Sequence, residues 1–109
     1  MYRFPKSRRL LKSEEFDRVF AAKRSRADRR LVVYVAPNEC QHARLGLVVS
    51  RKVGNSVVRG RWKRLLREAF RLSQQDLPAV DIVCLPRARH IPTLEGLTDS
   101  LSKLTRPQK

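Results

Sequence analysis

Apolar and polar positions alternate along the chain with a period that changes several times, and each period predicts one kind of element. Phe16, Val19 and Phe20 recur at the i, i+3, i+4 spacing of a single helix face. Ser13 precedes them and is a residue type that commonly caps a helix N-terminus. The pattern therefore predicts a short helix from Ser13 to about Ala22. Its spacing alone favours a place in the core for both phenylalanines.

Runs rich in β-branched residues predict the strands. Two of them follow a basic connection over 23–30 and cover residues 31–36 and 44–52. Because only a short polar turn separates these two runs, we expect them to pair antiparallel. A third run, over 79–85, predicts a further strand.

The helical period returns over residues 57–72, where apolar and basic side chains separate onto two sides of one helix. Asn55 or Ser56 is expected to cap its start. The apolar side is formed by Val58, Trp62, Leu65, Leu66, Ala69 and Leu72. The basic side is formed by Lys63, Arg64, Arg67 and Arg71, with Arg59 and Arg61 at its flanks. Since Glu68 is the one acid in this stretch, the unbalanced charge favours an anionic partner.

Leucines at i, i+3, i+7 and i+10 predict a last helix over 93–104. The resulting order, helix–strand–strand–helix–strand–helix, indicates a single α+β domain over residues 1–109. Within it, residues 1–12 are expected to form an extended basic arm. Residues 105–109 are expected to form a flexible tail.

The charge balance limits the classes of function that the protein can have. The chain of 109 residues holds 25 Lys and Arg against 10 Asp and Glu, a formal net charge of +15. Residues 1–30 carry 11 basic and 4 acidic residues and residues 51–71 carry 8 and 1, so each block has a net charge of +7. A small domain this basic points to a nucleic-acid partner, and it argues against a self-contained enzyme for a small neutral substrate.

Residue types that build catalytic and metal sites are sparse. Cys40 and Cys84 lie far apart without a C-x-x-C pair, so we expect free thiols rather than a zinc site. His42 and His90 are isolated, and no hydrolase or nucleotide-binding motif occurs. No apolar run has the length of a membrane span, and no signal peptide is visible. These observations predict a cytoplasmic protein with no membrane partner, no catalytic residue of its own and no bound metal.

The stretch KVGNSVVRGRWKRLLREAFR over residues 52–71 resembles the signature of the protein subunit of bacterial ribonuclease P. The family pattern is K-x-G-N-A-V-x-R-N-R-x-K-R-x-x-R-E-x-x-R, known as the RNR motif. The resemblance extends over residues 6–104. Other positions that fit the family are Leu10, Phe16, Phe20, Tyr34, Arg44 and Gly46.

Two positions depart from the family pattern. Ser56 replaces the usual alanine, which should matter little. Gly60 replaces the central asparagine of the motif, which removes a side-chain amide and places a glycine inside a helix. Arg59 and Arg61, on either side of it, match the pattern.

The resemblance implies a two-layer α/β sandwich, similar to a ribosomal-protein domain, with a left-handed βαβ crossover that contains the motif helix. It also implies a function. The protein would bind the catalytic RNA subunit and the single-stranded 5′ leader of precursor tRNA, and so promote removal of the leader to give the mature 5′ end. Catalysis would belong to the RNA subunit, which requires Mg²⁺, and the protein itself would hold no cofactor.

The resemblance also assigns residues, and it reverses the preference of the pattern alone for Phe16 and Phe20 as core residues. The leader-binding cleft would be lined by Phe16, Phe20, Tyr34, Arg59, Lys63 and Arg67. The RNA subunit would be contacted by Arg51, Lys52, Arg61, Arg64 and Arg71.

Three alternatives compete with this interpretation. A basic ribosomal-type RNA-binding protein would explain the charge and the fold but not the motif. A helix-turn-helix DNA-binding protein lacks its partner helix directly upstream of residue 57, where strand residues occur instead. A stand-alone nuclease would need a cluster of His and carboxylates that the sequence does not show.

Overall fold

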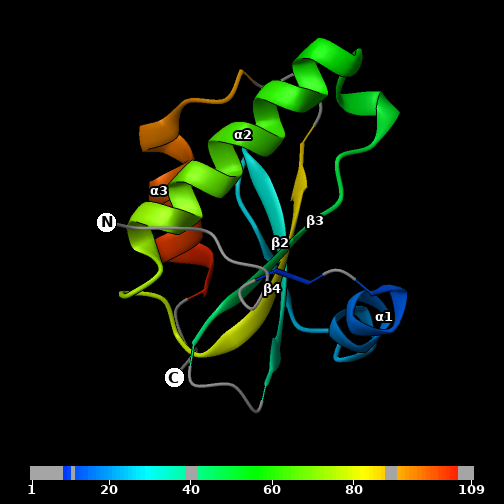
Figure 1. Ribbon diagram of the computed structural model, residues 1–109, viewed down its shortest axis with the longest axis vertical. Helices are drawn as coiled ribbons and strands as arrows, with labels where there is room; N and C mark the ends of the chain where they lie inside the picture. Colours follow the sequence, from blue (N-terminus) through cyan, green and yellow to red (C-terminus); the bar gives the residue numbers. More distant parts are fainter. Residues whose placement is uncertain (1–8, 11, 39–41, 88–90, 106–109) are drawn as a thin grey trace.

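The computed structural model describes residues 9, 10, 12–38, 42–87 and 91–105, which form three helices, a 3-10 turn and four strands. Figure 1 shows their arrangement. The elements are α1 (Ser13–Ala21), β1 (Ser25–Ala27), β2 (Leu31–Pro37), β3 (Arg44–Leu47), η2 (Arg51–Val53), α2 (Ser56–Ser73), β4 (Val80–Pro86) and α3 (Leu94–Thr105). The α+β class expected from the sequence is confirmed.

The four strands form one mixed sheet with the order β1-β2-β4-β3. Strand β4 runs antiparallel to β2 and parallel to β3. The antiparallel pair expected between the second and third strands of the chain is therefore wrong, because β4 lies between them. Four consecutive residues of β4, Asp81 to Cys84, are buried, so this strand takes the centre and the more exposed strands take the edges.

Helix α2 connects β3 to its parallel neighbour β4, as a parallel pair requires. The βαβ crossover expected from the family resemblance is thus present, and its left-handed sense stays a prediction. Helices α2 and α3 pack on one face of the sheet, and α1 packs on β2 and β4 from the other side (Figure 1). The structure therefore has three layers instead of the expected two. Helices α2 and α3 form one layer, the sheet forms the second, and α1 alone forms a smaller third layer on the other face of the sheet.

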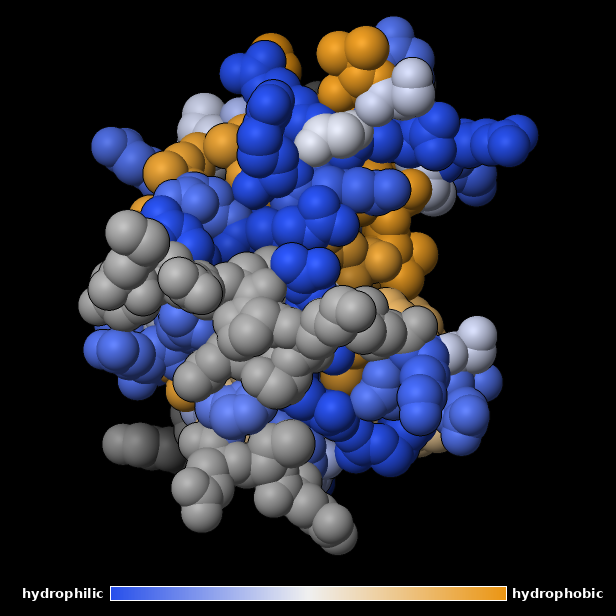
Figure 2. All heavy atoms as spheres, viewed as in Figure 1, coloured by the Kyte–Doolittle hydropathy of each residue, from blue (hydrophilic) through white to orange (hydrophobic). Residues whose placement is uncertain are grey.

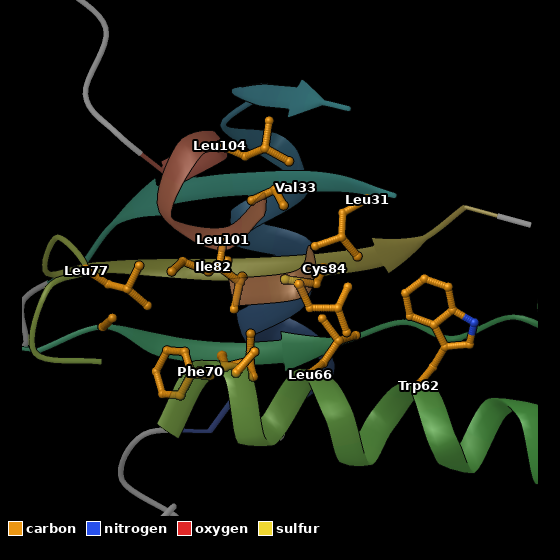
Figure 3. Packing of buried hydrophobic residues seen from close by; sticks show 14 residues of the cluster. Leu31, Val33, Trp62, Leu66, Phe70, Leu77, Ile82, Cys84, Leu101 and Leu104 are labelled. Carbon is orange, nitrogen blue, oxygen red and sulfur yellow. The ribbon is translucent and has the colours of Figure 1, made fainter. Parts of the chain in front are cut away.

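The larger core lies between the sheet and the helices α2 and α3 (Figure 3). Trp62, Leu66 and Phe70 lie one turn apart on α2 and are 0% exposed. Leu72 was expected on this side, but it lies at the rim of the buried arc and is 45% exposed. Phe70 takes the central place instead. The sheet and α3 contribute Leu31, Val33, Leu45, Ile82, Cys84, Leu97, Leu101 and Leu104.

Several boundaries differ from the sequence expectations. Lys12, not Ser13, is the N-cap of α1, and its backbone N–H donates to Glu15 Oε1 at 3.0 Å. Residues 25–27, which form strand β1, were expected to belong to the basic connection over 23–30. Strand β3 ends at Leu47 and η2 begins at Arg51, so the strand expected over 44–52 is shorter than predicted.

The ends of the chain are described only in part. Residues 9 and 10 lie beside β3, where Arg9 forms an isolated parallel bridge with Leu45. The other residues of the expected arm, except Lys12, lie outside the described residues. Thr105 belongs to α3 and is 5% exposed, so the expected tail cannot begin there. Residues 106–109 lie outside the described part of the chain.

Candidate nucleic-acid interface

Three aromatic side chains gather on the face of the sheet that α1 covers. Phe16 and Phe20 come from α1, and Tyr34 comes from β2. The rings of Phe20 and Tyr34 meet edge to face, with centroids 4.9 Å apart and planes at 75°. All three side chains are half-buried and pack around the buried Val19 and other residues of a second apolar cluster. We call Phe16, Phe20 and Tyr34 the aromatic face.

One row of residues across the sheet leaves room for the rings of the aromatic face. Tyr34, Val83 and Gly46 are direct neighbours across β2, β4 and β3. A Cβ atom on Gly46 would lie 2.6 Å from Phe16 Cε1, so only glycine lets the ring approach the strand this closely. The two phenylalanines of α1 therefore rest on one row of the sheet. Their half-buried state lies between the core position that spacing favoured and the open platform that the resemblance implies.

A buried carboxylate fastens α1 to the sheet beside this row. Asp81 in β4 is 0% exposed and accepts hydrogen bonds from Arg44 Nε and Nη2, both at 2.7 Å. Asn38 Nδ2 donates to the same carboxylate at 2.9 Å, and Arg18 of α1 forms an ion pair with it. Arg44 also donates to Glu15 Oε2 at 3.0 Å. We call these five residues the Asp81 network.

Burial alone would raise the pKa of Asp81, because a desolvated carboxylate favours its neutral form. The hydrogen bonds from Arg44 and Asn38 and the charges of Arg44 and Arg18 act in the opposite direction and outweigh it, so the pKa lies below its ordinary value. Asp81 is therefore ionised at neutral pH, and its carboxylate binds Arg44 of the sheet and Arg18 of α1.

Sequence reasoning did not find the Asp81 network, although a signal was present. The strand AVDIVCL contains one charged residue in an otherwise apolar run. A charged side chain in a buried strand needs a partner of opposite charge. The position of Asp81 in the sequence was therefore sufficient to predict a buried ion pair. Its partners, Arg44 and Arg18, are known only from the fold.

The basic residues of α2 lie on the side of the helix away from the core. Asn55 caps the helix as expected, since its side chain accepts a hydrogen bond from the Val58 N–H at 3.0 Å. Arg59 and Lys63 are half-buried, and Arg67 is exposed, at successive i, i+4 positions. The Nε atom of Arg59 is buried and has no hydrogen-bond partner among the described residues. An acceptor for it would have to come from outside them.

The residues expected to contact the RNA subunit divide into two groups. Arg51, Lys52, Arg61 and Arg64 are exposed on η2 and α2. Arg71 is half-buried and forms an ion pair with Glu68 one turn earlier, with Arg71 Nε 3.0 Å from Glu68 Oε2. Hydrogen bonding to Arg71 lowers the pKa of Glu68. The ion pair with Glu68 thus neutralises part of the charge of Arg71 within α2.

Gly60, the position that departs from the RNR motif, lies in the second turn of α2 on its exposed side. A Cβ atom there would have no neighbour within 4 Å among the atoms considered for such a contact, so the structure has room for a side chain. Gly54 differs, because its φ of 157° and the nearby Val58 side chain favour glycine. Gly54 thus builds the start of α2, whereas Gly60 meets no such requirement.

The two groups of predicted leader-binding residues lie on different elements and on opposite faces of the sheet. The aromatic face lies between α1 and the sheet, whereas Arg59, Lys63 and Arg67 lie along α2, which packs on the other face. Figure 2 shows a hollow with hydrophobic side chains in its wall at the edge of the molecule, between α1 and the region of η2 and the first turns of α2. No hydrogen bond or ion pair among the described residues joins the two groups directly.

Within the described ranges, His, Cys, Asp and Glu side chains form no group of three that could hold a metal ion. His42 has a polar contact of 3.1 Å between its Nδ1 atom and the Ala43 carbonyl oxygen, and His90 lies outside the described residues. Cys84 is a buried free thiol, and Cys40 is not described. None of the helices in the described part of the chain has the length and apolar composition needed to cross a membrane.

Comparison with known proteins gives consistent matches. The sequence profile of the family described as Ribonuclease P matches residues 4–107. The ribonuclease P protein component of Chromobacterium violaceum is 42% identical over 104 residues, which cover 94% of this chain and 84% of that protein. The corresponding protein of Brevibacillus brevis is 43% identical over 99 residues, covering 88% and 79%.

Solved structures agree with these sequence matches. The ribonuclease P protein of Staphylococcus aureus superposes with a TM-score of 0.80 at 36% identity, covering 91% of this chain and 93% of that one. The ribonuclease P protein of Thermotoga maritima superposes with a TM-score of 0.77 at 30% identity, covering 87% and 96%.

Proposed function

Because the chain belongs to the bacterial ribonuclease P protein family, and is therefore a subunit of an endoribonuclease of tRNA processing, we propose that it binds two RNAs through different surfaces. Membership of the family implies association with ribonuclease P RNA. The finer proposal is that the protein also holds the single-stranded 5′ leader of precursor tRNA. In this way it would promote removal of the leader by the RNA subunit.

The aromatic face is the observation that carries the leader proposal. Phe16, Phe20 and Tyr34 remain half-buried, although an ordinary core would enclose three such rings. Unpaired bases stack on exposed ring surfaces, with about 1–3 kcal/mol for each base, and every base has a surface that stacks. A site of this kind tolerates many leader sequences. The proposed leader-binding residues are Phe16, Phe20, Tyr34, Arg59, Lys63 and Arg67.

The exposed cations before and along α2 support contact with the RNA subunit. The guanidinium groups of the arginines present planar donors that match phosphate oxygens, and the described residues leave most of these cations without acid partners. Arg71 is the exception, because it would have to share its charge between Glu68 and a phosphate. The proposed RNA-subunit contacts are Arg51, Lys52, Arg61, Arg64 and Arg71.

The net charge of +15 suits a protein that lies between two polyanions. Catalytic RNA and precursor tRNA repel each other, and cations between them reduce that repulsion. The carboxylates of the Asp81 network are occupied by arginines, so they do not offer a Mg²⁺ site. We propose, as the family resemblance implies, that the Mg²⁺ requirement belongs to the RNA subunit. We also propose a cytoplasmic location without DNA or membrane partners.

The experiment that tests this function is cleavage of precursor tRNA by a bacterial ribonuclease P RNA at low Mg²⁺, with and without the protein. We expect slow cleavage by the RNA alone and correct 5′ processing when the protein is added. Tight RNA binding without any stimulation of cleavage would contradict the proposal.

Replacement of Phe20 tests the leader site. We expect Phe20→Ala to weaken holoenzyme affinity for precursor tRNA about tenfold, since one stacked base contributes about 1–3 kcal/mol. Affinity for mature tRNA should change little, because mature tRNA has no leader. Equilibrium binding of both tRNAs to the same holoenzyme preparation measures the difference.

Two further variants control this measurement. Phe20→Leu keeps apolar volume beside Tyr34 but removes the ring, so it should show the same selective loss with less effect on folding. Arg64→Ala should instead weaken assembly with the RNA subunit. Equal weakening for precursor and mature tRNA in both Phe20 variants would exclude a leader contact at this position.

A further inference from the structure

A second basic surface lies along the other edge of the sheet. Residues 23–30, KRSRADRR, carry five cations and one acid within eight residues. They run from the end of α1 through strand β1 to the turn before β2. Strand β1 is the edge strand opposite β3, so β2 and β4 separate this surface from β3.

Three of these five cations have no acidic or hydrogen-bonding partner among the described residues. The side chains of Lys23, Arg24 and Arg29 are exposed and make no ion pair or hydrogen bond with the described residues. Arg30 differs, because it reaches Ser100 at 3.4 Å and Asp99 at 3.9 Å on α3. We call Lys23, Arg24 and Arg29 the basic edge.

Asp28, the one acid in the segment, does not neutralise the basic edge. One of its carboxylate oxygens accepts the backbone N–H groups of Arg30 at 2.7 Å and Leu31 at 2.9 Å. The other accepts the Ser100 hydroxyl at 2.6 Å. Asp28 therefore holds the turn and joins it to α3, and its carboxylate makes no ion pair with Lys23, Arg24 or Arg29.

The backbone at Lys23 gives a second, independent observation. Lys23, which follows the C-cap residue of α1, lies in the left-handed region with a φ of 55°, and its N–H donates to the Phe20 carbonyl oxygen at 3.1 Å. Glycine is the usual residue at such a position, because a Cβ atom is unfavourable there. Lysine thus occupies a site where it costs stability. Strain of this kind is expected where a side chain serves a function.

We infer that the basic edge binds the phosphodiester backbone of RNA, as a contact separate from η2, α2 and the aromatic face. The inference rests on the proposed function and extends it. Because the aromatic face lies on the sheet between this edge and the opposite one, RNA bound there would have cations on both sides. Two RNAs share this chemistry, the RNA subunit and the precursor tRNA, and the experiment separates them.

The test uses Arg24→Gln, Arg29→Gln, the double variant and Lys23→Gly, with Lys103→Gln as the control. Lys103 is an exposed cation on α3 and does not belong to the basic edge. For each variant we would measure affinity for the RNA subunit, and affinity of the assembled holoenzyme for precursor tRNA, over a range of KCl concentrations. Thermal unfolding of each protein would be measured in parallel.

We expect each basic-edge substitution to lower affinity for one of the two RNAs roughly threefold and to reduce its log–log salt slope by ~0.7–0.9, as for one lost phosphate contact. Lys103→Gln should leave both values unchanged. Lys23→Gly should weaken RNA binding while raising the melting temperature. The RNA whose slope changes is the one that the basic edge contacts.

Unchanged slopes for both RNAs in the double variant would overturn the inference, and would leave these cations with a role in preventing pairing between sheet edges. Affinity losses that appear only together with lower melting temperatures would also overturn it. Neither result would affect the proposed function, which depends on stimulated cleavage by the unsubstituted protein and on the leader selectivity of the Phe20 variants.

Discussion

At the scale of single residues, glycine has opposite meanings at two positions of this chain. Gly46 is required by a contact, because the Phe16 ring occupies the space that a Cβ atom would need. Gly60 is not required by any contact, since its side of α2 is open. The sequence alone does not distinguish the two glycines. The fold shows that Gly46 makes room for a ring of the aromatic face, whereas Gly60 only lacks the side chain that the RNR motif has at this position.

Gly60→Ala should stabilise the protein. An exposed glycine inside a helix is less favourable than alanine by about 0.8–1 kcal/mol, and here no neighbour opposes the new methyl group. Urea denaturation should show a gain of this size, and the melting temperature should rise by a few degrees. Gly46→Ala is the matched contrast and should lower stability. A loss of stability in both variants would contradict the open position of Gly60.

At the scale of elements, periodic segments were predictable and pairings were not. Helices α2 and α3 and strands β2 and β4 follow clear patterns, because each buries one side or both faces. Strand β1 was missed, since its three residues include an arginine and carry no alternation of their own. The pairing of β2 with β4 was missed because chain proximity says nothing about which strand is buried enough to take the centre.

The position of α1 depends on a charge network that no local pattern contains. Arg18 of α1 forms an ion pair with Asp81 of β4, and Glu15 of α1 is joined to Asp81 through Arg44 of β3. The aromatic face is therefore held in place by an ion-pair network as well as by apolar packing. This makes the placement of Phe16 and Phe20 sensitive to acid.

Acid should weaken the protein through Asp81. Its pKa is lower in the folded state than its ordinary value of 3.8, so the folded state binds fewer protons than the unfolded state around that value. The stability that Asp81 contributes is present above the unfolded pKa and is lost as the pH falls through the folded pKa. Denaturant unfolding between neutral pH and about pH 2 should show this decline.

Asp81→Asn is the matched variant for this pH dependence. It should cost about 3 kcal/mol at neutral pH, because Arg44 and Arg18 lose a buried partner. Its stability should then depend less on pH in the acid range. If the variant and the original protein lost stability in parallel on acidification, the dependence would have to be assigned to other carboxyl groups.

At the scale of the whole molecule, composition and one motif indicated more about function than about architecture. The net charge of +15 pointed to a polyanion, and the RNR-like stretch distinguished ribonuclease P from a ribosomal-type protein. The family comparisons agree with that choice. The leader-binding and RNA-subunit residues stay predictions, because contacts with RNA depend on two molecules and this sequence describes only one of them.

Cys84 should report opening of the whole molecule. Its thiol is 0% exposed in the core beneath α2 and α3, and burial raises its pKa to about 12. A thiol that is neutral and enclosed reacts with maleimides only after the core opens. With Cys40→Ser leaving one thiol, the labelling rate should follow global unfolding as denaturant is raised. Rapid labelling in native conditions would show that α2 or α3 separates from the sheet by itself.

The central place of β4 has a consequence for how the molecule is made. Strands β1 and β2 can pair with each other soon after they leave the ribosome, but β3, apart from its bridge to Arg9, has no partner strand until residues 80–86 have been synthesised. Until then, the apolar sides of β2, β3 and α2 lack the strand that joins them. A nascent chain that stalls before β4 would therefore carry open strand edges and a charged surface that already attracts RNA. The order of synthesis thus exposes this chain to premature association until its last strand is complete.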